Sequence, residues 1–233
     1  MGPKILYGIL IALGIFIVIT LIRAVFFVPK KRETKPLEDE HVDVERVAKH
    51  LSGAIQIPTV SYPENEKIDW SQFEKFHKYL EDSYPLIHKT LERENVAEAS
   101  LLYRWKGKNP DLEPIALLSH QDVVPIEPGT EGDWTHEPFS GYNDGEFIWG
   151  RGALDMKNHL ICVMEAVEAL LEEGYEPERD VYLCFGHNEE VVASESAGAK
   201  AIMNTLKSRG IHLDSVIDEG GAILPVNVKH VLK

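Results

Sequence analysis

The sequence predicts an α/β domain built on a largely parallel sheet with helices on both faces, preceded by a transmembrane helix. Two observations indicate this fold class. Short apolar runs that suit buried strands alternate with longer segments in which apolar residues recur at helical spacing, and this alternation is typical of parallel sheets covered by helices. Near the N-terminus, one apolar stretch without a charge is long enough to span a bilayer.

The composition is that of an ordinary globular protein. Of the 233 residues, 44% are hydrophobic and 27% are charged, so disorder is not expected. The formal net charge of -14 argues against a nucleic acid as a partner, because phosphate binding needs a basic surface. The two cysteines, Cys162 and Cys184, are too few for a disulfide framework or a cysteine-rich zinc module.

Residues 1–28 predict a membrane anchor. Residues 5–22 read ILYGILIALGIFIVITLI without a charge, and after Arg23 the run AVFFV continues to Val28. This stretch is longer than the core of a typical signal peptide, and no small-residue cleavage site follows it. We therefore expect an uncleaved, single-pass membrane helix.

Residues 29–41 predict a linker between this anchor and the domain that follows. The segment reads PKKRETKPLEDEH, which is charged, contains two prolines and lacks periodicity. Lys4 stands alone on the N-terminal flank of the anchor, whereas basic residues crowd the linker. The positive-inside rule would then place the domain of residues 42–233 in the cytosol.

Within residues 42–233 the periodicity predicts helices and strands in alternation. We expect helices over 42–52, 70–91, 156–173 and 194–208. We expect strands over 100–105, 115–119, 147–149, 181–185 and 216–217. In α/β sheets of this kind functional groups gather beyond the carboxyl ends of the strands, so the residues after each strand are the candidates for chemistry.

Four successive strands are each followed by an imidazole or a carboxylate. In chain order these residues are His120 with Asp122, Asp155, Glu189 with Glu190, and Asp218 with Glu219. Each has an ordinary explanation by itself, since an acidic residue after a strand is most often a turn former or a helix cap. Four together, at the edge where an α/β sheet carries its site, favour a metal centre.

The spacing within this set suits two metal ions. His120 and Asp122 project to the same side of an extended chain, so the carboxylate can hold the second nitrogen of a metal-binding imidazole. Asp155 opens a helix, and its two oxygens can bridge cations about 3.5–4 Å apart. Glu189 and Glu190 are adjacent, so one can bind metal while the other reaches the water. Histidine and carboxylates without thiolates suit catalytic zinc, with manganese or cobalt as substitutes.

Five motifs resemble one known family. They are SHQDVVP, WTHEPFSG, GRGALDMKN, GHNEE and DEGG, in that order between Ser119 and Gly221. They resemble the carboxypeptidase S group of dinuclear zinc metallopeptidases, together with relatives that hydrolyse or form N-fatty-acyl amino acids and, more distantly, the aminoacylases. The resemblance covers roughly residues 40–233 and implies an α/β zinc-peptidase catalytic domain.

The resemblance also implies a set of ligands for two zinc ions. His120 would bind one zinc ion, Asp155 would bridge both, and Glu190 would bind the other. Glu219 would be a further ligand to the first ion, with Asp218 beside it as the alternative because the register of this motif is the least specific.

For catalysis, the resemblance implies hydrolysis of an amide bond next to a free carboxylate by a metal-bound hydroxide. Asp122 would orient the histidine ligand, and Glu189 would be the general base that passes a proton from the bridging water to the leaving amine. The substrate would be a C-terminal peptide bond or an N-acyl amino acid. Relatives of this kind act in a lumen or outside the cell, which is opposite to the cytosolic placement that the flanking charges favour.

Three departures from the family pattern leave an alternative open. Asn188 stands where an acidic residue is usual, and the run VVASESAG replaces a glycine after the Glu pair. The chain has about half the family length, without the lid domain that aids dimerisation and substrate binding and without the last histidine ligand. His230 could replace that ligand, but a lone histidine near the end of a chain is far more often a surface residue. The alternative is therefore a truncated, catalytically inactive, membrane-tethered fragment or isoform.

Overall fold

The structure is a computed structural model that describes residues 2–27, 42–191 and 198–220. Contacts divide the chain into two compact units, residues 1–42 and residues 43–233, and each is described by itself. The expected linker at 29–41, residues 192–197 of the VVASESAG run and His230 lie outside the described residues.

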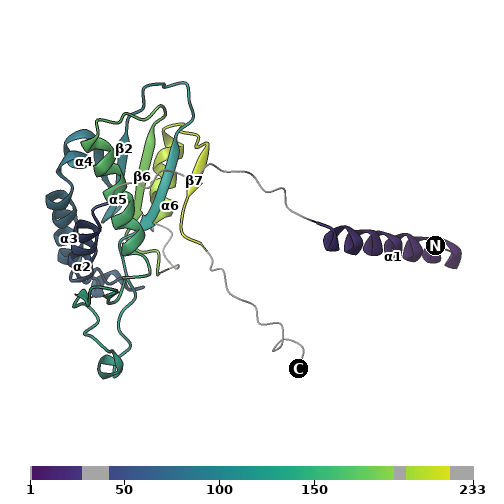
Figure 1. Ribbon diagram of the computed structural model, residues 1–233, viewed down its shortest axis with the longest axis horizontal. Helices are drawn as coiled ribbons and strands as arrows, with labels where there is room; N and C mark the ends of the chain where they lie inside the picture. Colours follow the sequence, from purple (N-terminus) through teal and green to yellow (C-terminus); the bar gives the residue numbers. More distant parts are fainter. Residues whose placement is uncertain (1, 28–41, 192–197, 221–233) are drawn as a thin grey trace. The chain divides into compact units, whose positions relative to one another are not determined.

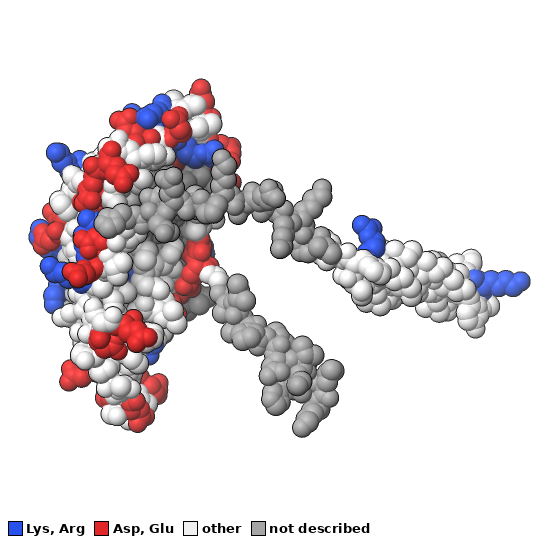
Figure 2. All heavy atoms as spheres, in the orientation of Figure 1, with Lys and Arg blue, Asp and Glu red and all other residues white. Residues whose placement is uncertain are grey.

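In the N-terminal unit the structure describes residues 2–27, and they form one long helix, α1 (Pro3–Val25). Pro3 occupies its first position, where a missing N–H costs nothing. In the described part of the chain it is the one helix long and apolar enough to cross a membrane, with a mean hydropathy of 2.9 over its best window. Figure 2 shows it uncharged along most of its length, with Lys4 and Arg23 as its charged residues. These properties suit a signal sequence as well as an anchor.

The second unit is built on a five-stranded mixed sheet with the strand order β1-β2-β6-β3-β7 (Figure 1). The strands are β1 (Glu92–Val96), β2 (Ser100–Trp105), β3 (Ile115–His120), β6 (Val181–Gly186) and β7 (Ser215–Ile217). β3 runs parallel to both of its neighbours, β6 and β7, whereas β2 is antiparallel to both β1 and β6.

The expectation of a largely parallel sheet is therefore wrong. The antiparallel half begins with a hairpin, because β1 and β2 are joined by three residues in which Ala97 has a φ of 54°. A connection this short can join only antiparallel strands. The sequence reading missed β1 because ERENV is polar, and the structure places it at the edge of the sheet, where polar residues face water.

Helices cover both faces of the sheet, as predicted (Figure 1). The helices are α2 (Val44–Ile55), α3 (Trp70–Ser83), α4 (Pro85–Thr90), α5 (Lys157–Glu172) and α6 (Gly198–Ser208), with short 3-10 turns at Asn65–Lys67 and Glu131–Asp133. Alternate residues of β2 divide the core: Leu101 and Tyr103 pack with α2 to α5, and Leu102 packs with α6.

Two further elements differ from the sequence prediction. The single helix expected over 70–91 is two helices, because Pro85 has no N–H to continue the hydrogen bonding of α3 and instead begins α4. The strand expected over 147–149 is β5 (Ile148–Trp149), which pairs with β4 (Tyr142–Asn143) in a separate two-stranded sheet. Acidic side chains are spread over the face of this unit seen in Figure 2, in keeping with the net charge of -14.

Lys157 ties the start of α5 to the end of α2. Its side chain is fully buried, and Nζ donates hydrogen bonds to the carbonyl oxygens of Ala54 at 2.9 Å and Ile57 at 2.6 Å. The ammonium also lies 4.8 Å from the ring centroid of Phe76. Burial lowers the pKa of Lys157 to about 7.

This buried lysine gives a prediction for stability. Between pH values of about 7 and 10.5 the unfolded chain binds more protons at Lys157 than the folded chain does, so the stability of the fold rises with pH across this window. Lys157→Met removes that contribution. Urea unfolding at several pH values should show that the wild-type free energy of unfolding rises relative to that of the variant by about 1 kcal/mol per pH unit. A difference that does not change with pH would contradict this placement of the lysine.

Candidate active site

The residues that follow three parallel strands lie at one edge of the sheet. β3 ends at His120, which lies opposite Gly186 at the end of β6, and β7 ends at Ile217 beside β3. Asp155 reaches the same place from the loop that precedes α5. The predicted gathering at the carboxyl ends therefore holds for three of the four segments, and the fourth arrives by a loop because β5 belongs to the small sheet.

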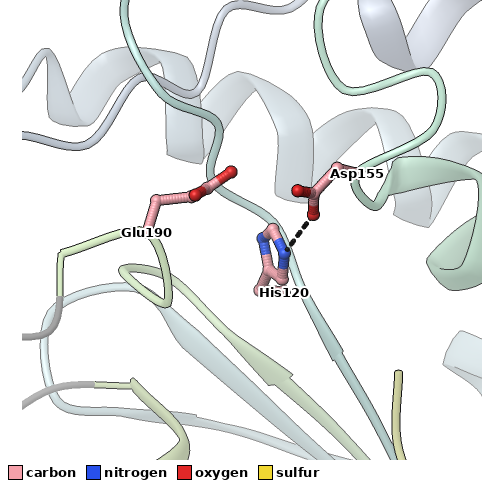
Figure 3. Close-up of side chains that lie close together, drawn as sticks. All are labelled: His120, Asp155 and Glu190. Carbon is pink, nitrogen blue, oxygen red and sulfur yellow. Dashed lines mark hydrogen bonds and ion pairs between the residues drawn. The ribbon is translucent and has the colours of Figure 1, made fainter. Parts of the chain in front are cut away.

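His120 is the centre of the gathering. Its side chain is 2% exposed, and Nε2 lies 3.1 Å from Oδ1 of Asp155, the contact drawn in Figure 3. The same nitrogen lies 3.8 Å from Oε2 of Glu189 and 4.0 Å from Oε1 of Glu219. Figure 3 shows the side chains of Asp155 and Glu190 turned toward the imidazole from opposite sides. One ring nitrogen therefore faces several carboxylates.

Two overlapping groups of side chains could each hold a metal ion, because within each group the possible ligand atoms lie within 4.8 Å of one another. One contains His120, Asp155 and Glu190, and the other contains His120, Glu189 and Glu219. An imidazole nitrogen with carboxylate oxygens is the donor chemistry that zinc, manganese and cobalt accept, so the residues present fit a divalent metal ion. Neither group contains Asp218, whose Oδ1 accepts a hydrogen bond from the N–H of Glu219.

Asp122 is buried beneath these groups. The nearest acceptor for Nδ1 of His120 is the backbone oxygen of Asp122 at 2.9 Å, while the carboxylate oxygen Oδ1 lies at 3.4 Å. In the neutral imidazole, with Nδ1–H donating in this direction, Nε2 carries no proton and can bind a metal ion. The sequence reading expected the carboxylate to orient the ring, and the structure adds the main-chain carbonyl of the same residue.

The carboxylate of Asp122 has further partners that the sequence reading missed. Oδ1 accepts from the N–H of Glu189 at 3.0 Å, and Oδ2 accepts from the N–H of Glu190 at 3.2 Å. Oδ2 also accepts from the hydroxyl of Ser61 at 2.6 Å. The sequence gives no signal for this serine, because it lies 61 residues from Asp122 and outside the five motifs.

The electrostatics of the site follow from this arrangement. Burial alone would lower the pKa of His120, but the hydrogen bonds and the charge of Asp122 raise that pKa to about 9. Burial raises the pKa of Asp122, yet hydrogen bonds from His120 and Ser61 outweigh it and hold the pKa below its usual value. Burial and the charge of Asp155 raise the pKa of Glu190. A bound cation would offset the repulsion between carboxylates that lie this close together.

Comparison with known proteins identifies the family. Residues 116–228 match peptidase family M20/M25/M40. The chain is 43% identical over 188 residues to carboxypeptidase S of Saccharomyces cerevisiae, an alignment that covers 76% of this chain and 32% of the yeast protein. The chain belongs to the M20 peptidase family. It is also 39% identical over 203 residues to the N-fatty-acyl-amino acid synthase/hydrolase of Mus musculus, with 84% of this chain and 39% of the mouse protein covered.

Solved structures agree on the fold of this M20 chain. A metallo-carboxypeptidase of the M20 family from Sulfolobus solfataricus superposes with a TM-score of 0.58 at 21% identity, over 76% of this chain and 37% of that one. A Bacillus subtilis protein described as a dinuclear metal-binding peptidase of the M20 family gives a TM-score of 0.50 at 18% identity, over 78% and 44%. The chain spans about a third of the length of the curated relatives it matches.

Proposed function

We propose that this chain supplies the dinuclear metal centre of a hydrolase that cleaves amide bonds adjacent to a free carboxylate. The observation that carries the proposal is the convergence on Nε2 of His120 of carboxylates from three separate segments of the chain. The substrate class comes from the relatives: one is named a carboxypeptidase and another an N-fatty-acyl-amino acid synthase/hydrolase. A C-terminal peptide bond and an N-acyl amino acid share the amide that precedes a free carboxylate.

In this proposal the predicted ligands keep the roles that their positions suggest. His120 and Glu219 would hold one ion, Glu190 would hold the other, and Asp155 would be shared between them. Asp155 suits the bridge because one of its oxygens already faces the imidazole while Glu190 belongs to the same group. When bound, a pair of zinc ions polarises the scissile carbonyl and lowers the pKa of water. The donor set also accepts manganese or cobalt.

Glu189 is the general base in this proposal. Its side chain is half-exposed, so the carboxylate is open to water and substrate, and it lies 3.8 Å from Nε2 of His120. Its main chain is held by Asp122, which keeps the carboxylate close to the ligands without occupying its oxygens. Glu189 therefore takes a proton from water at the site and delivers it to the amine that leaves.

The helix α1 has a place in the same proposal. We assign it as a single-pass membrane anchor, since its length and hydropathy are sufficient to span a bilayer. Under this assignment the protein partitions into membranes, and it stays there when the membranes are washed with high salt or carbonate.

A pair of matched substrates tests the reaction class. The purified protein, loaded with zinc, is offered an N-acyl amino acid and the same compound with its carboxylate converted to a carboxamide, and amino acid release is measured. We expect hydrolysis of the free acid and much slower hydrolysis of the carboxamide. Equal rates on the two compounds would contradict the requirement for a free carboxylate. If neither the N-acyl amino acid nor a dipeptide offered in a parallel assay were hydrolysed, the proposed function would be contradicted.

A further inference from the structure

Ser61 is the one side-chain hydroxyl that contacts the Asp122 carboxylate among the described residues. We propose that Ser61 is a positioning residue of the metal centre, which acts by fixing Asp122 and, through it, the main chain of Glu189 and Glu190. This inference rests on the proposed function, because it assumes that the residues around Asp122 bind metal.

The main chain places Ser61 beside Asp122. Val60 forms a parallel bridge with Val123, with the N–H of Val123 donating to the oxygen of Thr59 at 3.0 Å and the N–H of Ser61 donating to the oxygen of Val123 at 3.2 Å. Ser61 is 1% exposed, so its hydroxyl is shielded from bulk solvent. The bridge therefore delivers a buried hydroxyl to the carboxylate in a fixed register.

The segment that carries Ser61 is also tied to the loop of Asp155. Lys157 follows Asp155 by two residues, and its ammonium binds the carbonyl oxygens of Ala54 and Ile57, just before the Ser61 segment. A continuous chain of buried contacts thus runs from the start of α5, through this segment, to Asp122. It connects the loop of the proposed bridging ligand with the loop of the Glu pair.

The partners of the Asp122 carboxylate show what Ser61 adds. The two oxygens together hold the N–H groups of Glu189 and Glu190, so rotation of the carboxylate would break both main-chain bonds at once. The bond from Ser61 is the shortest of the three, at 2.6 Å, and it resists that rotation. Without it, we expect the Glu pair to lose its fixed position relative to His120.

The experiment uses cobalt(II) as the probe and the full chain. Cobalt(II) affinity and its visible absorption spectrum are measured for wild type and Ser61→Ala, with circular dichroism and thermal unfolding as checks of the fold. We expect Ser61→Ala to bind cobalt(II) about tenfold more weakly, the lower end of the effect of outer partners on metal ligands, and to change the spectrum. Ser61→Thr, which keeps the hydroxyl, should recover the wild-type spectrum.

A buried hydroxyl two residues away provides the matched control. Thr59 is fully buried, and its Oγ1 donates to the backbone oxygen of Gln121 at 2.6 Å, so Thr59→Val removes a similar bond that does not reach the carboxylate. We expect Thr59→Val to leave cobalt(II) affinity unchanged. In an Asp122→Asn background, Ser61→Ala should cause no further loss of affinity, because its effect passes through Asp122.

The outcomes separate this inference from the proposed function. If wild type binds cobalt(II) and Ser61→Ala binds it within about twofold of wild type, the inference is wrong and the proposed metal centre stands. An equal loss in Thr59→Val would also overturn it, since the effect would then belong to the stability of the segment. A folded wild-type chain that binds no cobalt(II) would overturn the proposed function, and this inference with it.

Discussion

Glu189→Gln is expected to lower turnover by about 10²- to 10⁴-fold while leaving metal content unchanged, because the amide cannot accept a proton and the proposed ligands are untouched. Glu189 suits this role because its carboxylate is half-exposed beside Nε2 of His120 while its main chain is held by Asp122. Steady-state hydrolysis of an N-acyl amino acid, with elemental analysis of the same samples, measures both quantities.

The neighbouring residue gives the sharpest control for this prediction. Glu190→Gln changes the same functional group one position along the chain, but it removes a proposed ligand, so metal content should fall together with turnover. Near-normal turnover in Glu189→Gln would show that another group is the base. Loss of metal from Glu189→Gln with retention in Glu190→Gln would show that the two roles are exchanged.

His120→Ala is expected to weaken metal binding by more than about 100-fold, beyond the loss that follows from changing an outer partner of a ligand. His120 is the residue common to both groups of candidate ligands, and its Nε2 is the atom that the carboxylates surround. The variant should therefore lose metal from the site as a whole, and activity with it.

A second histidine serves as the control. His136 stacks on Tyr142, with ring centroids 4.1 Å apart, and belongs to neither group of candidate ligands. His136→Ala should keep the wild-type metal content, measured by dialysis against a chelator followed by elemental analysis. Unchanged metal in His120→Ala would remove this residue from the set of ligands.

Much of the fold was predictable because its buried strands are short, apolar runs. The predicted strand at 100–105 matches β2, and those at 115–119 and 181–185 each fall one residue short of β3 and β6. The meeting of the candidate residues was predictable for a related reason: parallel strands end at a common edge, so side chains that follow β3, β6 and β7 come together even though they are far apart in sequence.

The remaining features depend on tertiary contacts that no local pattern reveals. The polar strand β1 forms because its hairpin partner β2 supplies the hydrogen bonds, and Asp155 reaches His120 although its preceding strand belongs to another sheet. In the sequence Ser61 lies in an ordinary loop, and only the Val60–Val123 bridge places it beside Asp122. Neither periodicity nor a motif could have singled it out.

The measurement that tests the metal centre most directly is the stoichiometry of zinc on the purified chain. The protein is loaded with zinc, loosely bound metal is removed, and zinc per chain is determined by elemental analysis on a sample whose fold is verified by circular dichroism. The arrangement of His120, Asp155, Glu190 and Glu219 predicts about two zinc ions per chain. A folded chain that retains no zinc would contradict it.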